Sequence, residues 1–114
     1  MNNPKTLLLP TCKGLECILF NEIVRIEASS NYSKLFFNNG KTLVVAKVLH
    51  WFEDKLPKEI FTRVHRSHLI NMHYISHYCL TKCSSITLID NSLIVIARRK
   101  KVGIEKILGT RIAA

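Results

Sequence analysis

The chain has 114 residues, a length that suits one domain rather than two. Its hydrophobic content of 47% allows a buried core, which excludes a mainly disordered chain. No apolar run approaches the roughly 18 residues of a membrane span or the core of a signal peptide, so a cytoplasmic protein is expected.

The charge is strongly positive and unevenly distributed. Seventeen Lys and Arg against eight Asp and Glu give a formal net charge of +9. The second half, residues 58–114, carries ten of the basic and three of the acidic side chains, a net charge of +7. This excess favours a polyanionic partner without indicating any fold.

The first half of the chain predicts short strands. Residues 14–20 and 22–28 are rich in apolar and β-branched side chains and partly alternate with polar ones. The polar cluster at 29–31 predicts a turn before a strand over 32–37. Asn and Gly at 38–40 then favour a tight hairpin, because both tolerate a positive φ, and Lys41 to Val45 would form the returning strand.

One helix is predicted over residues 46–56. Its apolar stripe, at helical spacing, consists of Val45, Val48, Leu49, Phe52 and Leu56. Pro57 should end this helix, since the residue before a proline disfavours the helical conformation.

The second half continues with short strands and a closing helix. Strands are predicted over 74–80, 84–89 and 92–96, with Asp90-Asn91 as a two-residue hairpin between the last two and a turn at 81–83. Residues 98–108 predict a short helix that ends at Gly109. The chain therefore indicates one compact, β-rich domain.

The four cysteines, Cys12, Cys17, Cys79 and Cys83, lack the C-x2-C spacing of common zinc modules. Reduced and mostly buried thiols are expected. An alternative is a metal site formed by four side chains of zinc-ligand type. They are separated by even numbers of residues, so one unbroken strand would place them on the same face: His73, His77, Cys79 and Cys83. That span is too long for one straight strand, so no metal is expected.

Motifs of enzymes are missing from the sequence. It contains no glycine-rich phosphate loop, no G-x-S-x-G and no H-E-x-x-H, and His65 and Ser67 have no activating carboxylate nearby in the chain. We expect neither an enzyme nor a cofactor. Three polar or basic clusters remain between the apolar strands: Asn31 to Lys34, His65 to His68, and Arg98 to Lys101.

Three segments around these clusters resemble one family. Residues 23–32 (I-V-R-I-E-A-S-S-N-Y), 61–71 (F-T-R-V-H-R-S-H-L-I-N) and 93–100 (L-I-V-I-A-R-R-K) are similar, in order, to motifs of the LytTR DNA-binding domain. The resemblance covers residues 14–108 of a single domain spanning 1–114. Two positions depart from the family: Ala97 replaces its usual Ser, and Ile94 replaces its frequent Pro.

The resemblance implies an elongated, all-β fold, a sandwich of small sheets with one or two short helices. It also implies a bacterial transcription regulator, either a stand-alone protein or the excised output domain of a response regulator. Such domains bind duplex promoter DNA, often at direct repeats, by inserting loops and strand ends into the major groove. We expect this chain to be a monomer or a weak dimer when it is not bound to DNA.

The resemblance also assigns roles to residues. Arg66 and Arg99 are expected on base edges, which the guanidinium group contacts with two hydrogen bonds. The expected phosphate and backbone contacts are Ser33 or Lys34, together with Arg98 and Lys100. The expected supporting residues are Asn31, His65, Ser67 and Asn71, of which His65 should orient its loop and Asn71 should satisfy backbone groups.

Two other classes of function stay open at this stage. A basic β-barrel for single-stranded nucleic acid would stack bases on exposed aromatic rings, for which Tyr32, Phe36 and Phe37 are candidates. A non-catalytic protein-interaction domain would use the basic patches for an acidic protein.

Overall fold

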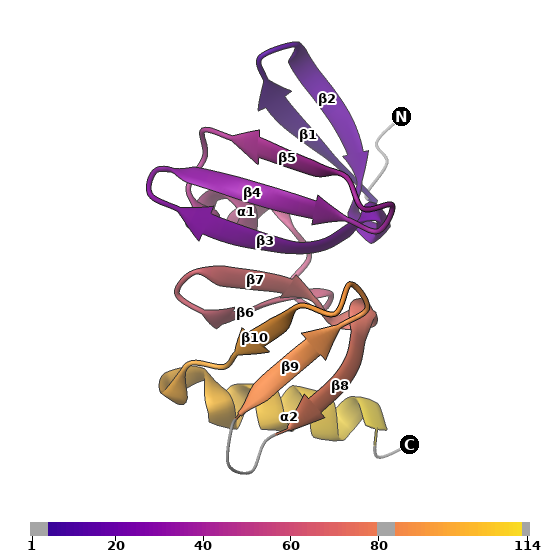
Figure 1. The fold of residues 1–114 in the computed structure, drawn as a ribbon, viewed down its shortest axis with the longest axis vertical. Helices are drawn as coiled ribbons and strands as arrows, with labels where there is room; N and C mark the ends of the chain where they lie inside the picture. Colours follow the sequence, from indigo (N-terminus) through magenta and orange to yellow (C-terminus); the bar gives the residue numbers. More distant parts are fainter. Residues whose placement is uncertain (1–4, 80–83, 113–114) are drawn as a thin grey trace.

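The computed structural model describes residues 5–79 and 84–112, which form ten short strands, two α-helices and three 3-10 turns (Figure 1). The strands are β1 Thr6–Thr11, β2 Gly14–Leu19, β3 Ile23–Ser29, β4 Tyr32–Phe37, β5 Thr42–Val45, β6 Phe61–His65, β7 His68–Asn71, β8 Ile75–Cys79, β9 Ser85–Leu88 and β10 Leu93–Val95. The helices are α1 Leu49–Lys55 and α2 Lys101–Ile112, and the 3-10 turns are η1 Phe20–Glu22, η2 Met72–Tyr74 and η3 Arg98–Lys100.

The strands form three antiparallel sheets. The central sheet has the order β5-β4-β3-β7-β6, and the hairpin β1-β2 and the sheet β10-β9-β8 lie at its two ends (Figure 1). The molecule measures 44 × 33 × 24 Å. The predicted elongated, all-β fold with two short helices is therefore confirmed.

Two separate cores pack against the central sheet. Neighbouring residues of a strand point to opposite faces, so Leu69 enters one core and Ile70 the other. The first core lies between the sheet, the β1-β2 hairpin and α1, with Phe52 of α1 fully buried in it. The second core joins β6 and β7 to the β8-β9-β10 sheet and α2, through Ile86, Leu88 and Ile104 among others.

Strand β1 was not predicted. Leu7 and Leu9 are buried and Leu8 is exposed, which is the alternation of a half-buried strand. Because residues 7–9 are all leucine, the sequence shows no alternation of apolar and polar residues there.

Of the two predicted hairpin loops, one agrees with the structure and the other does not. At 38–40 the hairpin forms as predicted: Gly40 adopts φ +87°, and the Phe37 N–H donates to the Lys41 carbonyl over 2.9 Å. The expected two-residue loop Asp90-Asn91 is wrong, because β9 ends at Leu88 and β10 begins at Leu93, so the loop also contains Ile89 and Ser92. Asn91 takes the positive φ of this longer loop, +67°, a conformation that Asn tolerates.

The helices begin and end differently from the prediction. Helix α1 starts three residues later than expected, and Val48, at its N-cap, is 51% exposed rather than part of the apolar stripe. Leu56 adopts an extended conformation before Pro57 and ends α1, as predicted. Gly109 does not end α2, which continues to Ile112; one glycine within a helix costs only about 1 kcal/mol relative to alanine.

The cysteines are less buried than expected. Cys12 and Cys17 are exposed and Cys79 is half-buried, and none of these three is part of a disulfide. His73 lies in η2 rather than in a strand, and the pairing of β8 is irregular between Ile75 and His77, so the expected common face is interrupted. Cys83 and the predicted turn at 81–83 lie outside the described residues.

The described residues contain no group of three or more His, Cys, Asp or Glu that is placed to hold a metal ion. In the same part of the chain, neither α-helix is long and apolar enough to cross a membrane.

Candidate nucleic-acid interface

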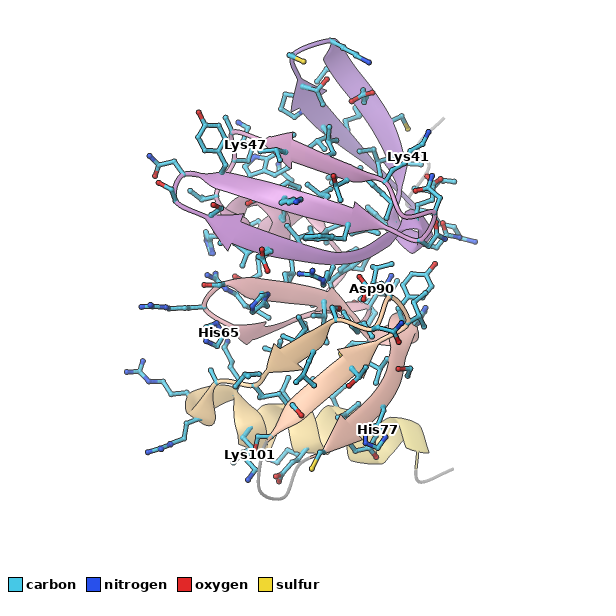
Figure 2. All side chains as sticks on the ribbon, in the orientation of Figure 1. Lys41, Lys47, His65, His77, Asp90 and Lys101 are labelled. Carbon is cyan, nitrogen blue, oxygen red and sulfur yellow. The ribbon has the colours of Figure 1, made fainter. Side chains whose placement is uncertain are left out.

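Three turns lie along one long side of the molecule: the β3-β4 turn at Ser30-Asn31, the β6-β7 turn at Arg66-Ser67, and η3 (Figure 1). Because β3 pairs antiparallel with both β4 and β7, the first two turns lie at the same end of these strands. The Ala28 N–H donates to the Ser67 carbonyl over 2.8 Å and joins them. Figure 2 places His65 on this side and Asp90 and His77 on the opposite side.

The β6-β7 turn is held by side chains. His65 Nδ1 accepts a hydrogen bond from the Ser67 N–H at 3.1 Å, which is the loop-orienting contact expected of His65. The Arg63 guanidinium donates to the Arg66 carbonyl at 2.5 Å and to Glu53 Oε1 at 2.9 Å. The turn is thus tied to helix α1, while the Arg66 side chain is exposed.

The η3 turn is held by backbone hydrogen bonds. The Ala97 N–H donates to the Val64 carbonyl of β6 at 2.7 Å, and the Lys100 N–H donates to the Ala97 carbonyl at 2.9 Å. Ala97 is the N-cap of η3 and offers no side-chain capping bond. The next three side chains, Arg98, Arg99 and Lys100, are exposed.

Together these two turns enclose an open hollow of about 580 Å³, here called the basic hollow. Its lining residues are Glu53, Arg63, His65, Arg66, Ala97, Arg98, Arg99 and Lys100. Five of these side chains are cationic and one is anionic, so the hollow can receive a polyanion. Its guanidinium groups can also form paired hydrogen bonds with phosphates or with the edge of guanine.

The structure brings five of the predicted site residues together in the basic hollow: the expected contact residues Arg66, Arg98, Arg99 and Lys100, and the supporting residue His65. Their segments are more than 30 residues apart in the sequence and meet because Ala97 pairs with β6.

The predicted residues near the β3-β4 turn lie apart from the hollow. Asn31 is exposed in the turn, and Lys34 is half-buried on the open face of the sheet, with Nζ 5.1 Å from the centre of the Phe36 ring. Ser33 is fully buried, and its hydroxyl donates to the Lys47 carbonyl at 2.6 Å. Since this hydroxyl does not face solvent, Ser33 fixes the backbone after β5 and is not retained as a contact residue.

Asn71 is buried and serves the backbone, as expected. Its amide nitrogen donates to the Ile23 carbonyl, and its amide oxygen accepts from the His73 N–H, both at 2.9 Å. It therefore connects β7 to β3 behind the interface.

Glu53 and Arg63 were missed as site residues. Arg63 lies within the motif at 61–71, which was a usable signal, because a charged residue near the end of a strand needs a partner or solvent. Glu53 gave no local signal, since only the packing of α1 against β6 brings it to Arg63.

A further titratable group lies next to the β6-β7 turn. Burial lowers the pKa of His68, and His65 and Arg25 lower it further. Glu27, with Oε1 at 3.8 Å from His68 Nδ1, opposes this shift without reversing it. His68 Nδ1 is buried and makes no hydrogen bond, which agrees with burial as the leading cause.

The sequence matches the LytTr DNA-binding domain family over residues 13–109. A similar solved structure is described as the LytTr DNA-binding domain of a response regulator from Bacillus cereus, with a TM-score of 0.76 and 22% sequence identity. The similarity covers 92% of this chain and 97% of that one, and at this identity it supports the fold alone. No curated protein gives a significant match.

Proposed function

The chain belongs to the family of LytTr DNA-binding domains, and from this premise we propose that it binds duplex DNA sequence-specifically as a bacterial transcription regulator or its output domain. The observation that carries the proposal is the convergence of Arg66 with Arg98, Arg99 and Lys100 in the basic hollow. Cations from two separate segments surround one open space, which suits a ligand with several negative charges.

In the proposed complex, turns rather than a helix enter the major groove. Arg66 and Arg99 contact base edges, and Arg98 and Lys100 contact phosphates. Lys34 contacts the DNA backbone near the β3-β4 turn, and Asn31 supports that turn. The β3-β4 turn lies on the same long side of the molecule as the basic hollow, so the two can contact one duplex at separate positions (Figure 1).

The proposed role is non-catalytic, and the proposed partner is promoter DNA with direct repeats. A monomer or weak dimer suits direct repeats, because two copies then bind in the same orientation rather than about a two-fold axis.

Duplex binding is favoured over single-strand binding by the placement of the aromatic rings. The Arg25 guanidinium lies 3.6 Å from the centre of the Phe36 ring, and Phe37 packs against the first core. Of the three candidate stacking residues, Tyr32 alone is exposed, whereas single-strand binders use successive aromatic platforms.

The test is selection of binding sites from a random duplex pool, followed by titration of the selected duplex, a scrambled duplex and the single strand. We expect a recurrent motif and preference for the selected duplex over the other two. A pool without enrichment contradicts specific binding, and a preference for the single strand supports the β-barrel alternative. Failure to bind any DNA at low salt supports a protein-interaction domain.

A further inference from the structure

We propose that Glu53 and Arg63 are positioning residues for base recognition: they hold the β6-β7 turn so that Arg66 is presented to DNA, and contact no DNA themselves. This inference rests on the proposed function and assigns a specificity role to two residues outside the expected contact set.

Arg63 is the centre of this arrangement. It is 23% exposed, and its two terminal nitrogens are both engaged, one by Glu53 of α1 and the other by the Arg66 carbonyl. A planar guanidinium can hold two acceptors in a fixed relative geometry. Arg63 therefore fixes the peptide of Arg66 relative to a helix of the first core, and with it the direction in which the Arg66 side chain leaves the turn.

Glu53 has two effects of opposite sign on DNA binding. It orders the turn through Arg63, which favours a directional contact with one base. It is also the one carboxylate among the described residues that line the basic hollow, so its charge repels phosphates of any sequence. Glu53 should thus increase discrimination while lowering affinity for DNA in general.

Substitution of Glu53 separates these effects. In Glu53→Gln we expect affinity for a scrambled duplex to stay equal or rise about twofold, because the repelling charge is lost. Affinity for the selected duplex should fall, so that the ratio of the two affinities drops by about tenfold. Most structural damage would instead lower the affinities for the selected and the scrambled duplex together.

Asp54→Asn is the matched control. Asp54 is the next residue of α1, is 61% exposed, and shares with Glu53 its contact with His50, at 3.4 Å in this case. The change in net charge is the same, but Arg63 keeps its partner. We expect this variant to raise both affinities equally and to leave their ratio unchanged.

Arg63→Lys tests the need for the planar fork. Lysine keeps the charge but cannot hold Glu53 and the Arg66 carbonyl in one rigid plane. We expect the same loss of discrimination as in Glu53→Gln, with an unchanged salt dependence of binding. An unchanged affinity ratio in Arg63→Lys overturns the proposal.

The closing experiment combines Glu53→Gln with Arg66→Ala on both duplexes, with urea unfolding of each variant as the measure of stability. If Glu53 acts through Arg66, its substitution has no further effect on the affinity ratio once Arg66 is truncated. The proposal is overturned if the effect persists in the Arg66→Ala background, or if Glu53→Gln lowers both affinities by the same factor. If the proposed function itself is wrong, the unchanged protein shows no preference for any duplex. That result is distinct from a failure of the proposal for Glu53 and Arg63.

Discussion

The β6-β7 turn and η3 meet in the same hollow but are fixed by different means. The first has one backbone bond, from the Ala28 N–H to the Ser67 carbonyl, and in addition the side-chain bonds of His65, Arg63 and, through Arg63, Glu53. Backbone bonds hold the second: the Ala97 N–H to Val64 and the Ile96 N–H to Ser84. Among the described residues, Arg98, Arg99 and Lys100 form no ion pair, although all three are charged.

This difference indicates a division of work between the two turns. A side chain on a fixed backbone loses less conformational entropy when it forms a directional contact, which suits base recognition by Arg66. Three adjacent free cations on η3 suit phosphates, whose positions vary little with sequence. Arg99 departs from this division, because it lies on η3 but is assigned to a base edge. Variants of the two turns therefore test how far the division holds.

The largest effect is expected for Arg66→Ala. Loss of a bidentate contact should cost about 1–3 kcal/mol on the selected duplex and relax the preference at one or two base pairs. Arg66→Lys should not restore it, because an ammonium lacks the planar fork. Titration against selected and scrambled duplexes measures both changes. Equal losses on the two duplexes would show that Arg66 contributes charge and no base contact.

Arg99→Ala is expected to cost affinity in the same range of about 1–3 kcal/mol, at the lower end, and at a different base pair. The reason is that η3 offers less restraint to its side chains than the β6-β7 turn does. Repeating the site selection with this variant reveals the altered base position. A selected motif identical to that of the unchanged protein would move Arg99 to the phosphate-contacting group.

Ala97→Ser should further stabilise η3. Ala97 is the N-cap of η3 and lacks a capping side chain. A serine hydroxyl there can accept an orphan N–H of the following turn, which should raise the free energy of unfolding by about 0.5–1 kcal/mol. Urea unfolding measures this gain, and Ala97→Val is the control, since valine is a poor N-cap. Equal stability of the serine and valine variants would refute the capping argument.

The sequence predicted the fold well where alternation and turn residues were clear. It did not reveal β1, whose two buried positions and the exposed position between them are all leucine, or the full length of the 89–92 loop, in which Asn91 rather than a glycine takes the positive φ. The local pattern also predicted, wrongly, that α2 ends at Gly109. Packing of α2 on the second core outweighs the destabilising effect of one glycine within the helix.

The candidate site was predictable only where its residues belong to motifs. Arg66 and Arg99 were named from the sequence and do line one hollow. Ser33 was named too, but a shift of one residue along a strand decides whether a side chain faces solvent or core, and Ser33 faces the core. The Glu53–Arg63 pair joins a helix to a strand ten residues later, which no local spacing encodes.

Lys100→Ala should have a small effect that does not depend on sequence. For the unchanged protein, log affinity should fall linearly with log salt, with a slope equivalent to roughly 4–7 phosphate contacts. Removal of one phosphate contact should lower that slope by about one and weaken selected and scrambled duplexes alike. Titrations between 50 and 200 mM salt measure the slope. An unchanged slope would remove Lys100 from the phosphate contacts.

The smallest effect concerns pH and should be confined to the side-chain-held turn. Because the pKa of His68 is lower in the folded chain than its ordinary value of 6.5, the unfolded chain binds more protons between these two values. The free energy of unfolding should therefore fall as the pH drops below about 6.5 and stop falling below the folded pKa. Urea unfolding at several pH values between 7.5 and 5 measures this, and His68→Gln should remove that part of the dependence. Since His68 opens β7 directly after the turn, amide NMR shifts of Arg66 and Ser67 should become less sensitive to pH in His68→Gln, while those of Arg98 to Lys100 stay unchanged. If both variants show the same pH dependence, another group is responsible, and the β6-β7 turn is no more sensitive to protonation than η3.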